Sequence, residues 1–350
     1  MSDSPSLDVL ALDIGGANLK ASDGRAFCAS RSFPLWKRPG DLPDAIERLL
    51  ATTADARRWI VTMTGELADC YRTKREGVTA ILDAVVVTAG RRARPPEVEV
   101  YLTDGSFVSI EDARGRHLAA AASNWHALAS FVARRCGGAR GLLIDVGSTT
   151  CDLIPFADGQ VVAAGRTDDE RLRSGELVYT GVVRTPLCAV VASLPTRQGP
   201  TPTARELFAT TRDAYLLLDR LAEDPSDCET ADGRPAVKPR AHERLARCVC
   251  ADVESFTFDE AVLAAAAVQE AQQRDVVTAF GRVLDRFGRS PEVVVLSGQG
   301  EFLARDSWTR RNHDRASAAR LRSLTEELGT AASQVAPAFA LAQLASEARP

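Results

Sequence analysis

Hydrophobic and polar positions along this chain follow a pattern that occurs twice. In the first copy, apolar runs at 7–13, 18–22 and 25–30 predict a three-stranded meander, with an Asp-Gly pair before the last run. This dipeptide between apolar runs favours a tight hairpin turn. The same succession, with its own Asp-Gly pair, runs through residues 141–165. Two equivalent meanders predict two related lobes.

Between the meanders, the spacing of apolar residues predicts a β-α-β progression. The predicted elements are helices at 41–54, 76–90 and 117–138, a strand at 58–66 and a hairpin at 97–110. The last of these helices ends at a glycine pair, as helices commonly do, and we expect it to cross to the second lobe.

Beyond the second meander, the pattern predicts a mostly helical insertion. A polar segment rich in loops at 165–186 is followed by helix-favouring segments at 203–222, 239–251 and 258–288, a strand and glycine turn at 291–303, and a closing helix at 335–348. We expect a first lobe at 1–138 and a second lobe at 139–350, with the insertion at about 166–290.

Composition excludes several classes of protein. Hydrophobic residues make up 45% of the chain and charged residues 26%, and the formal net charge is -4, so electrostatics give no reason to bind nucleic acid. No apolar run reaches the roughly 18 residues of a membrane span, and the N-terminus lacks a secretion signal. The eight cysteines follow no disulfide or zinc spacing. We therefore expect a cytoplasmic protein with reduced thiols and without nucleic-acid or membrane partners; its oligomeric state is open, a homo-oligomer included.

Each meander breaks at an Asp followed by glycine and small polar residues, DIGGANLK in the first copy and DVGSTTCD in the second. Glycine lets backbone N–H groups approach an anion closely, and Mg²⁺ takes carboxylate oxygens while keeping several waters. We therefore predict Asp13 and Asp145 as Mg²⁺ ligands. A single such turn is more often an ordinary tight turn, and only the repetition favours a phosphate site. The predicted phosphate contacts are Gly15, Gly16, Lys20, Gly147, Ser148, Thr149 and Thr150.

The two meanders and a late strand that ends in SGQG resemble the superfamily of actin, the sugar kinases and Hsp70. Longer strings resemble the hydantoinase A/oxoprolinase group, and within it the tetrahydromethanopterin-linked one-carbon transfer family. These strings, which span most of the chain, are DIGGANLK, MTGELADC, SNWHALA, DVGSTTCDLIP, TDDERL, GELVYTGVVRTP and SGQGEFLA. The resemblance implies an α/β protein with the actin-like ATPase fold, in which two ribonuclease-H-like lobes clasp a phosphate ligand between them.

The same resemblance implies a synthase of the methanofuran type, an alkyl transferase other than a methyltransferase. Such an enzyme joins an aminomethylfuranmethyl diphosphate to the phenol oxygen of a tyramine or tyrosine derivative and releases pyrophosphate. The residues themselves indicate something narrower, which is a site for linked phosphates and a divalent cation between two lobes. The two interpretations agree chemically, because magnesium and backbone N–H groups can stabilise charge on the leaving oxygens.

A phenol is largely protonated at neutral pH, so ether formation would gain from a base near the acceptor oxygen. Glu66, just past a strand end, is the first candidate, and Asp152, just past the second turn, is the other. The plainer alternatives are a carboxylate favoured by a helix dipole for Glu66 and a hairpin residue for Asp152. Arg184 could fork onto a phosphate or carboxylate as a third catalytic group, or belong to an ordinary surface ion pair.

Further positions are predicted to contact the substrates. Trp125 lies in the crossing helix, where an aromatic residue is more often core. The glycines of SGQG occupy the adenosine-side turn of the superfamily, and here they would line the furan or acceptor pocket. The predicted substrate contacts are Asn124, Glu176, Tyr179, Gly298 and Gly300.

Two other kinds of function remain open from the sequence. An ATP-dependent small-molecule kinase or a hydantoin-opening amidohydrolase would use the same three turns, but would produce ADP and phosphate in place of pyrophosphate. A nucleotide-switched scaffold in the manner of actin or Hsp70 would need a peptide-binding extension or a long exposed apolar stretch, and we expect neither.

Overall fold

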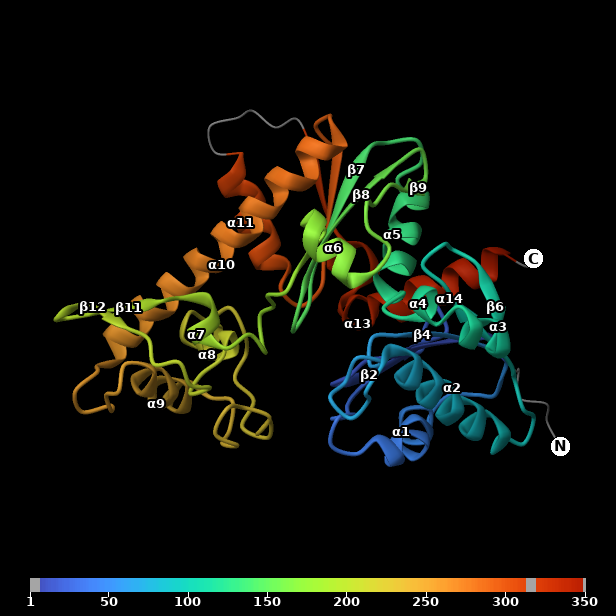
Figure 1. Ribbon diagram of the computed structural model, residues 1–350, viewed down its shortest axis with the longest axis horizontal. Coiled ribbons are helices and arrows are strands. Elements are labelled where there is room, and N and C mark those ends of the chain that lie inside the picture. The colour runs from blue at the N-terminus through green and yellow to red at the C-terminus, as the bar shows by residue number, and fades with distance from the viewer. Residues whose placement is uncertain (1–6, 313–318, 349–350) are drawn as a thin grey trace.

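Two β-sheets form the centres of two lobes (Figure 1). The structure is a computed structural model that describes residues 7–312 and 319–348, so the predicted outer limits 1 and 350 lie outside the described residues. The two sheets fall on either side of the boundary between residues 138 and 139, which remains our proposed division of the chain.

The first sheet has parallel strands at its centre. It is six-stranded, in the order β3-β2-β1-β4-β5-β6, and comprises β1 (Leu7–Ile14), β2 (Asn18–Ser22), β3 (Cys28–Ser32), β4 (Ala56–Met63), β5 (Glu97–Tyr101) and β6 (Phe107–Ser109). Side chains alternate between the faces of a strand, and along β1 Leu10 and Leu12 enter one hydrophobic cluster while Val9 and Ala11 enter another. Because β1 is covered on both faces, its sequence is apolar almost throughout.

The second sheet repeats the surroundings of β1 around β7. Its strands, in the order β10-β8-β7-β13-β14 with β9 beside β8, are β7 (Gly141–Val146), β8 (Cys151–Ala157), β9 (Gln160–Val161), β10 (Leu177–Val178), β13 (Val293–Ser297) and β14 (Arg320–Ser323). As β1 pairs with antiparallel β2 and parallel β4, β7 pairs with antiparallel β8 and parallel β13. The α/β fold with two related lobes is therefore confirmed.

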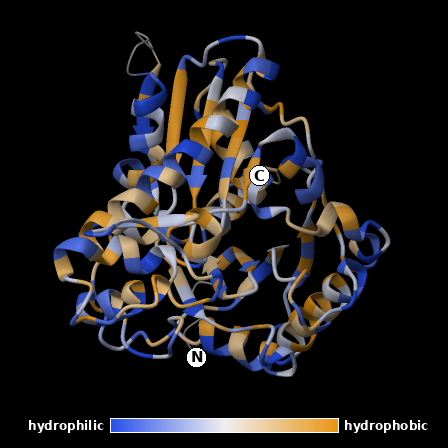
Figure 2. Ribbon diagram, turned by 60° about the vertical axis from the view of Figure 1, so that its left-hand side comes forward, coloured by the Kyte–Doolittle hydropathy of each residue, from blue (hydrophilic) through white to orange (hydrophobic). Residues whose placement is uncertain are grey.

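Helices cover the sheets, and hydrophobic residues concentrate on the strands and on the sides of helices that face them (Figure 2). The helices are α1 (Leu42–Leu49), α2 (Lys74–Gly90), α3 (Ile110–Gly115), α4 (His117–Ala120), α5 (Asn124–Arg135), α6 (Asp168–Ser174), α7 (Leu187–Val190), α8 (Thr211–Leu217), α9 (Lys238–Cys248), α10 (Phe258–Phe287), α11 (Glu301–Arg311), α12 (Leu324–Leu328), α13 (Thr330–Gln334) and α14 (Ala336–Ala348), with a 3₁₀ turn at Pro39–Asp41. Within the part of the chain that the structure describes, no helix has both the length and the apolar character needed to cross a membrane.

Helices α5 and α14 lie between the two sheets (Figure 1). One hydrophobic cluster joins Val9 and Ile60 of the first sheet, Leu143 of the second sheet, and the buried sides of both helices. Phe131 of α5 packs edge-on against Phe339 of α14, with 6.1 Å between ring centroids. This shared core fixes the two sheets relative to each other, since neither sheet can turn without exposing apolar surface.

Some predicted elements have different bounds in the structure. The third strand begins at Cys28 and not at residue 25, because the Asp23 carboxylate accepts hydrogen bonds from the Arg25 and Phe27 N–H groups and lengthens the turn. The corresponding strand of the second copy, predicted at 160–165, is only the two residues of β9. The segment at 165–186, predicted to be rich in loops, also contains α6 and β10, and the helix predicted at 203–222 is confined to α8.

The predicted helix at 117–138 is two helices, α4 and α5. The break falls at residues 121–123, where Ala122 has a φ of 47°, a conformation that side chains other than glycine seldom adopt. The break has a structural consequence, because it brings Ala122 and the first turn of α5 to the space between the lobes.

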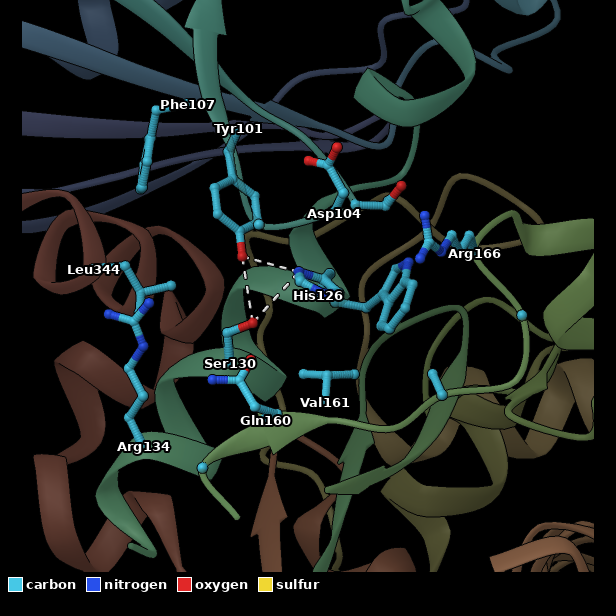
Figure 3. Close-up of a pocket in the computed structure, with 16 residues that line it drawn as sticks. Tyr101, Asp104, Phe107, His126, Ser130, Arg134, Gln160, Val161, Arg166 and Leu344 are labelled. Carbon is cyan, nitrogen blue, oxygen red and sulfur yellow. Dashed lines mark hydrogen bonds between the residues drawn. The ribbon is translucent and has the colours of Figure 1, made fainter. Parts of the chain in front are cut away.

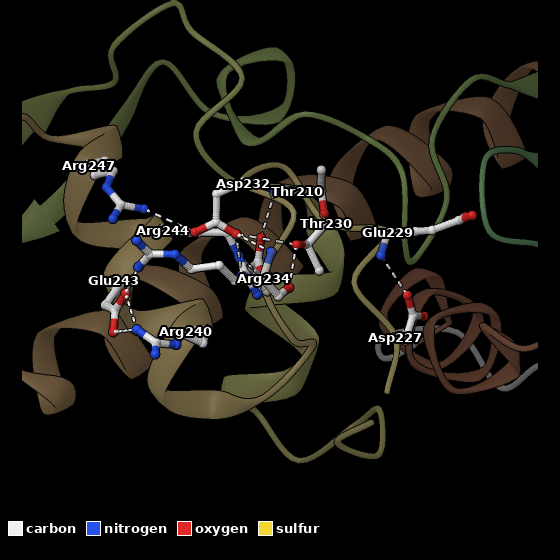
Figure 4. Close-up of polar contacts among 11 residues, drawn as sticks. Thr210, Asp227, Glu229, Thr230, Asp232, Arg234, Arg240, Glu243, Arg244 and Arg247 are labelled. Carbon is white, nitrogen blue, oxygen red and sulfur yellow. Dashed lines mark hydrogen bonds and ion pairs between the residues drawn. The ribbon is translucent and has the colours of Figure 1, made fainter. Parts of the chain in front are cut away.

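The insertion has a hydrophobic core of its own and lies to the left in Figure 1. It contains α7, α8, α9 and the two-stranded sheet of β11 (Ser193–Thr196) and β12 (Gly199–Pro202), against the first part of α10. Its loop at 223–237 is held by a network of ion pairs around Arg244 (Figure 4). Arg244 is fully buried and donates to Asp213 Oδ1 at 2.8 Å and to Asp232 Oδ1 at 2.9 Å.

Removing this buried cation should destabilise the insertion. We predict that Arg244→Met lowers the free energy of unfolding by about 3–5 kcal/mol, because it leaves the Asp213 carboxylate buried without a counter-charge. The matched control is Arg234→Met, whose partner Glu243 and guanidinium are both partly solvated, and whose cost should stay below about 1 kcal/mol. Urea unfolding at neutral pH measures both, and equal losses would contradict the prediction.

Candidate functional site

The ends of β1 and β7 meet at a cavity of about 540 Å³ between the lobes. Parallel strands end at the same edge of their sheet, so each strand delivers the residues that follow it to this space. Most of the residues predicted from the sequence line this one cavity. They are Asp13, Gly15, Gly16, Lys20, Glu66, Asn124, Asp145, Gly147, Ser148, Thr149, Thr150, Asp152, Tyr179 and Arg184.

In each of the two glycine turns, the N–H group of the first glycine forms the hydrogen bond that closes the turn. Gly15 N–H donates to Asn18 O at 3.0 Å, and Gly147 N–H donates to Thr150 O at 2.9 Å. A Cβ at Gly15 would lie 2.7 Å from Asn18 O, so the first turn requires glycine there. Within the described residues, the N–H groups of Gly16 and Ser148 make no hydrogen bond, so both are available to an anion in the cavity.

Asp13 and Asp145 face the same buried space from opposite lobes. Asp13 is 3% exposed, and its Oδ1 has no hydrogen-bond partner. Burial raises the pKa of both carboxyl groups, and the charge of Asp145 raises that of Asp13 further. Lys20 is the cross-strand neighbour of Asp13, and its charge acts on both carboxyl groups to lower their pKa. The site thus concentrates negative charge that one lysine only partly offsets.

The donor set fits a magnesium ion that keeps water. Asp13 Oδ1 is a buried acceptor without a donor, a costly arrangement that a cation would relieve. In the described part of the chain, no group of three or more His, Cys, Asp or Glu side chains could hold a metal. Two carboxylates would leave the other coordination positions of a cation to water and phosphate oxygens. This arrangement suits Mg²⁺ better than zinc.

Glu66 is a buried carboxylate without a counter-ion. It follows β4, is 1% exposed, and its Oε2 has no hydrogen-bond partner. Burial raises the pKa of Glu66 to about 7; the charge of Asp168 acts in the same direction and that of Lys74 opposes it. Helix α2 approaches it closely, since a Cβ at Gly77 would lie 2.1 Å from Glu66 O. Gly77 is therefore a positioning residue that the sequence analysis missed.

Asp152 has a different environment from Glu66, because it is paired. Its carboxylate forms an ion pair with buried Arg171, which also donates to Asp168 at 3.2 Å. Burial raises the pKa of Asp152 to about 6 and the Arg171 charge opposes the rise. The guanidinium carbon of Arg171 lies 4.1 Å from the centre of the Trp125 ring. Asp152 is thus a weaker candidate base than Glu66, since its charge is already engaged.

The sequence analysis also missed several residues that line the cavity. Arg171 and Asp168 belong to the string TDDERL, which was noted only for its resemblance; the signal that could have found them is the spacing of Arg171 three residues after Asp168 in a capped first turn. Trp36 reaches the cavity from the first lobe, and the Arg184 guanidinium carbon lies 4.8 Å from its ring centre. This contact spans the two lobes at the rim. Leu67 and Tyr179 also line the cavity, and they are 63% and 66% exposed.

Three predicted substrate contacts do not line the cavity. Glu176 is buried, and its carboxylate accepts hydrogen bonds from Ala164 N–H at 2.6 Å and Gly165 N–H at 2.9 Å. It therefore holds the chain that leads into α6. Gly298 has a φ of 87°, and a Cβ there would lie 2.8 Å from Asp145 Oδ1; a Cβ at Gly300 would lie 2.5 Å from the Val146 side chain. Both glycines let the turn after β13 pack against the end of β7.

Comparison with known proteins assigns the class. The α/β fold with two related lobes is similar to that of a solved structure. Nucleotide-free acetone carboxylase matches with a TM-score of 0.56 at 11% identity, over 96% of this chain and 70% of that chain. The model of the hydantoinase/oxoprolinase family matches residues 57–345. The chain therefore belongs to the hydantoinase/oxoprolinase family, as its sequence motifs indicated.

Two curated proteins that are similar to this chain in sequence have the same name, "(4-{4-[2-(gamma-L-glutamylamino)ethyl]phenoxymethyl}furan-2-yl)methanamine synthase". The protein from Methanocaldococcus jannaschii is 34% identical over 340 residues, which cover 96% of this chain and 97% of the relative. The protein from Methanococcus vannielii is 30% identical over 203 residues, which cover 58% of this chain and 89% of the relative.

Protonation of Glu66 should be visible in stability without any substrate. Its pKa in the folded state is raised from 4.5 to about 7, so its favourable contribution is complete below its unfolded pKa and is lost as pH rises through about 7. We predict that Glu66→Gln is more stable than the wild type at about pH 8, by up to about 3 kcal/mol, because one pKa unit is worth about 1.4 kcal/mol.

Near pH 4 this gain should disappear, since wild-type Glu66 is then uncharged in both states. Urea unfolding of both proteins over this pH range measures the difference. Exposed Glu111 on α3 provides the control, and Glu111→Gln should show no such pH dependence. A Glu66→Gln variant that loses stability at high pH would refute the assignment of a neutralised carboxyl group.

Proposed function

We propose that this protein is a magnesium-dependent transferase that joins an aminomethylfuranmethyl diphosphate to the phenol oxygen of a tyramine or tyrosine derivative and releases pyrophosphate. Its place would be in the biosynthesis of methanofuran-type cofactors for one-carbon transfer. Support comes from the name of the two relatives. The observation that carries the proposal is a single cavity that holds two opposed aspartates and, beside them, an unpaired glutamate whose pKa is about 7.

The diphosphate end would lie between the two glycine turns. Asp13 and Asp145 are the residues that would hold Mg²⁺, which would supply charge neutralisation for the departing pyrophosphate. Lys20 adds a positive charge beside them, and the free N–H groups of Gly16 and Ser148 can donate to phosphate oxygens. Thr149 and Thr150, which line the same wall, offer hydroxyl donors.

The acceptor end would lie toward Glu66 and the aromatic rim. In the reaction, the phenol oxygen forms a bond to the furfuryl carbon as the bond from that carbon to the diphosphate oxygen breaks, and the electron pair leaves with pyrophosphate. The phenol proton moves to Glu66. A carboxylate with a pKa near 7 is a better base at neutral pH than an ordinary one, and remains largely ionised above that pH. Trp36 and Tyr179 present ring surfaces at the cavity mouth that suit a phenyl or furan ring.

The two aspartates give the sharpest test of this function. We predict that Asp13→Asn and Asp145→Asn each reduce kcat on the order of 10³-fold, since each removes a charge that stabilises the leaving group. Pyrophosphate release from the furfuryl diphosphate and a phenolic acceptor is followed with Mg²⁺ present. The control is Asp285→Asn, an exposed acid on α10, which should retain wild-type activity.

A binding measurement separates metal loss from misfolding. Mg²⁺ with pyrophosphate should raise the melting temperature of the wild type, because a ligand that binds only the folded state stabilises it, and should not raise that of either aspartate variant. The product decides between this function and its rival. Production of ADP and phosphate from ATP, with no ether formed, would instead support a kinase or a hydantoinase-type amidohydrolase.

A further inference from the structure

A second cavity, of about 300 Å³, adjoins the first at Trp125, and Figure 3 draws the residues that line it. Trp125 is the residue that the linings of the two cavities share. The second cavity lies between the turn that joins β5 to β6, the middle of α5, strand β9 and the segment that leads into α6. None of its lining residues has a role in the reaction proposed above.

One wall of this cavity is a set of neutral hydrogen-bonding groups held in place by packing. His126 and Ser130 are four residues apart on α5 and so lie on one face of it. The buried hydroxyl of Tyr101 lies 2.9 Å from His126 Nδ1 and 3.3 Å from Ser130 Oγ (Figure 3). Burial lowers the pKa of His126 to about 4, so this imidazole is uncharged at neutral pH. Phe107 supports the Tyr101 ring edge-on at 5.2 Å.

The cavity also carries fixed charges of both signs. The Arg166 guanidinium lies at its edge and has no side-chain partner among the residues that the structure describes. Asp104 lies on the same side of the view in Figure 3. Although burial acts to raise it, hydrogen bonds from Ser106 and Arg116 hold the pKa of Asp104 at about 2. Asp104 is therefore an anion at neutral pH, and it already pairs with the half-exposed Arg116, so a ligand ammonium would share this carboxylate with Arg116.

We propose that this cavity binds the amino-acid end of the phenolic acceptor, a group that carries an α-carboxylate and an α-ammonium. The carboxylate would pair with Arg166, and the ammonium with Asp104. Neither a simple anion nor a simple amine would use both charges, whereas a zwitterion uses both. The inference rests on the proposed function, because the name of the relatives includes a γ-L-glutamylamino group on the phenoxy side of the product.

The shared tryptophan explains how one acceptor could occupy both cavities. The phenol would stand in the cavity of Glu66, and the γ-glutamyl end would extend past Trp125 into the second cavity. Trp125 is almost fully buried, and its Nε1–H has no hydrogen-bond partner, so this donor is available to the amide that links the two ends of such an acceptor. Recognition at both ends would place the phenol oxygen with fewer freely rotating bonds.

Steady-state kinetics with γ-glutamyltyramine and with tyramine test this assignment. We predict that Arg166→Ala raises KM for γ-glutamyltyramine roughly tenfold or more with kcat unchanged, because a charge-assisted hydrogen bond is lost, and leaves KM for tyramine unchanged. Arg173→Ala is the control, since Arg173 is an exposed arginine of α6 that pairs with Asp169 and lies in neither cavity. It should not alter either KM.

A matched pair of acceptors tests the proposed contact between Asp104 and the ligand ammonium. Asp104→Asn should weaken the use of γ-glutamyltyramine and have no effect on N-glutaryltyramine, which keeps a carboxylate and lacks the ammonium. Calorimetric binding of γ-glutamyltyramine to wild type and to Arg166→Ala adds a readout that does not need turnover, with the same tenfold weakening expected.

The outcomes separate this inference from the proposed function. If ether forms with both acceptors and Arg166→Ala changes their KM values equally or not at all, the cavity assignment is wrong and the transferase function stands. If no ether forms with either acceptor, the transferase function is wrong. Binding of γ-glutamyltyramine that depends on Arg166 in a protein without turnover would make the cavity a separate ligand site, and would also overturn its assignment to the acceptor.

Discussion

The core that α5 and α14 build between the two sheets is the constraint on which the rest of the structure depends. Val9 and Ala11 of β1 pack on one side of this core, and Leu143 of β7 packs on the other. Because the two strands are fixed from behind by close-packed apolar groups, the acidic residues at their ends have no freedom to separate. Asp13 and Asp145 therefore share a space that neither lobe could form alone.

This arrangement brings more acidic groups together than nearby cations offset. Asp13, Glu66, Asp145 and Asp152 line one cavity, and the cations among its lining residues are Lys20, Arg171 and Arg184. Arg171 is engaged by Asp152, and Arg184 lies at the rim over Trp36. The carboxyl groups of Asp13, Glu66 and Asp145 have no such arginine partner, and burial raises the pKa of each. Perturbed carboxyl groups that converge in a cleft are typical of a site for cations or catalysis, because stability alone would not select them.

The partners of each carboxylate distinguish the candidate bases, which the sequence alone did not separate by environment. Glu66 and Asp152 both follow a strand or turn at the same cavity, yet only Asp152 has an arginine beside it. The carboxylate of Glu176 also has partners, because it accepts hydrogen bonds from backbone N–H groups in the segment before α6. Of these three acids, Glu66 is thus the one with a buried carboxylate oxygen that lacks a partner, and the close approach of α2 at Gly77 fixes the main chain that carries it.

The sequence by itself determined the repeated meanders, the apolar strands and the acidic turns, because side-chain alternation, Asp-Gly hairpins and strand-glycine turns are local properties of a few adjacent residues. It also indicated the family, through strings that span most of the chain. Only the tertiary structure decided that the helix predicted at 117–138 breaks at Ala122, that Arg171 pairs with Asp152, and that Trp125 separates two cavities. Each depends on groups far apart in the chain, and the free energy of burying or pairing such groups is set by neighbours that no local pattern records.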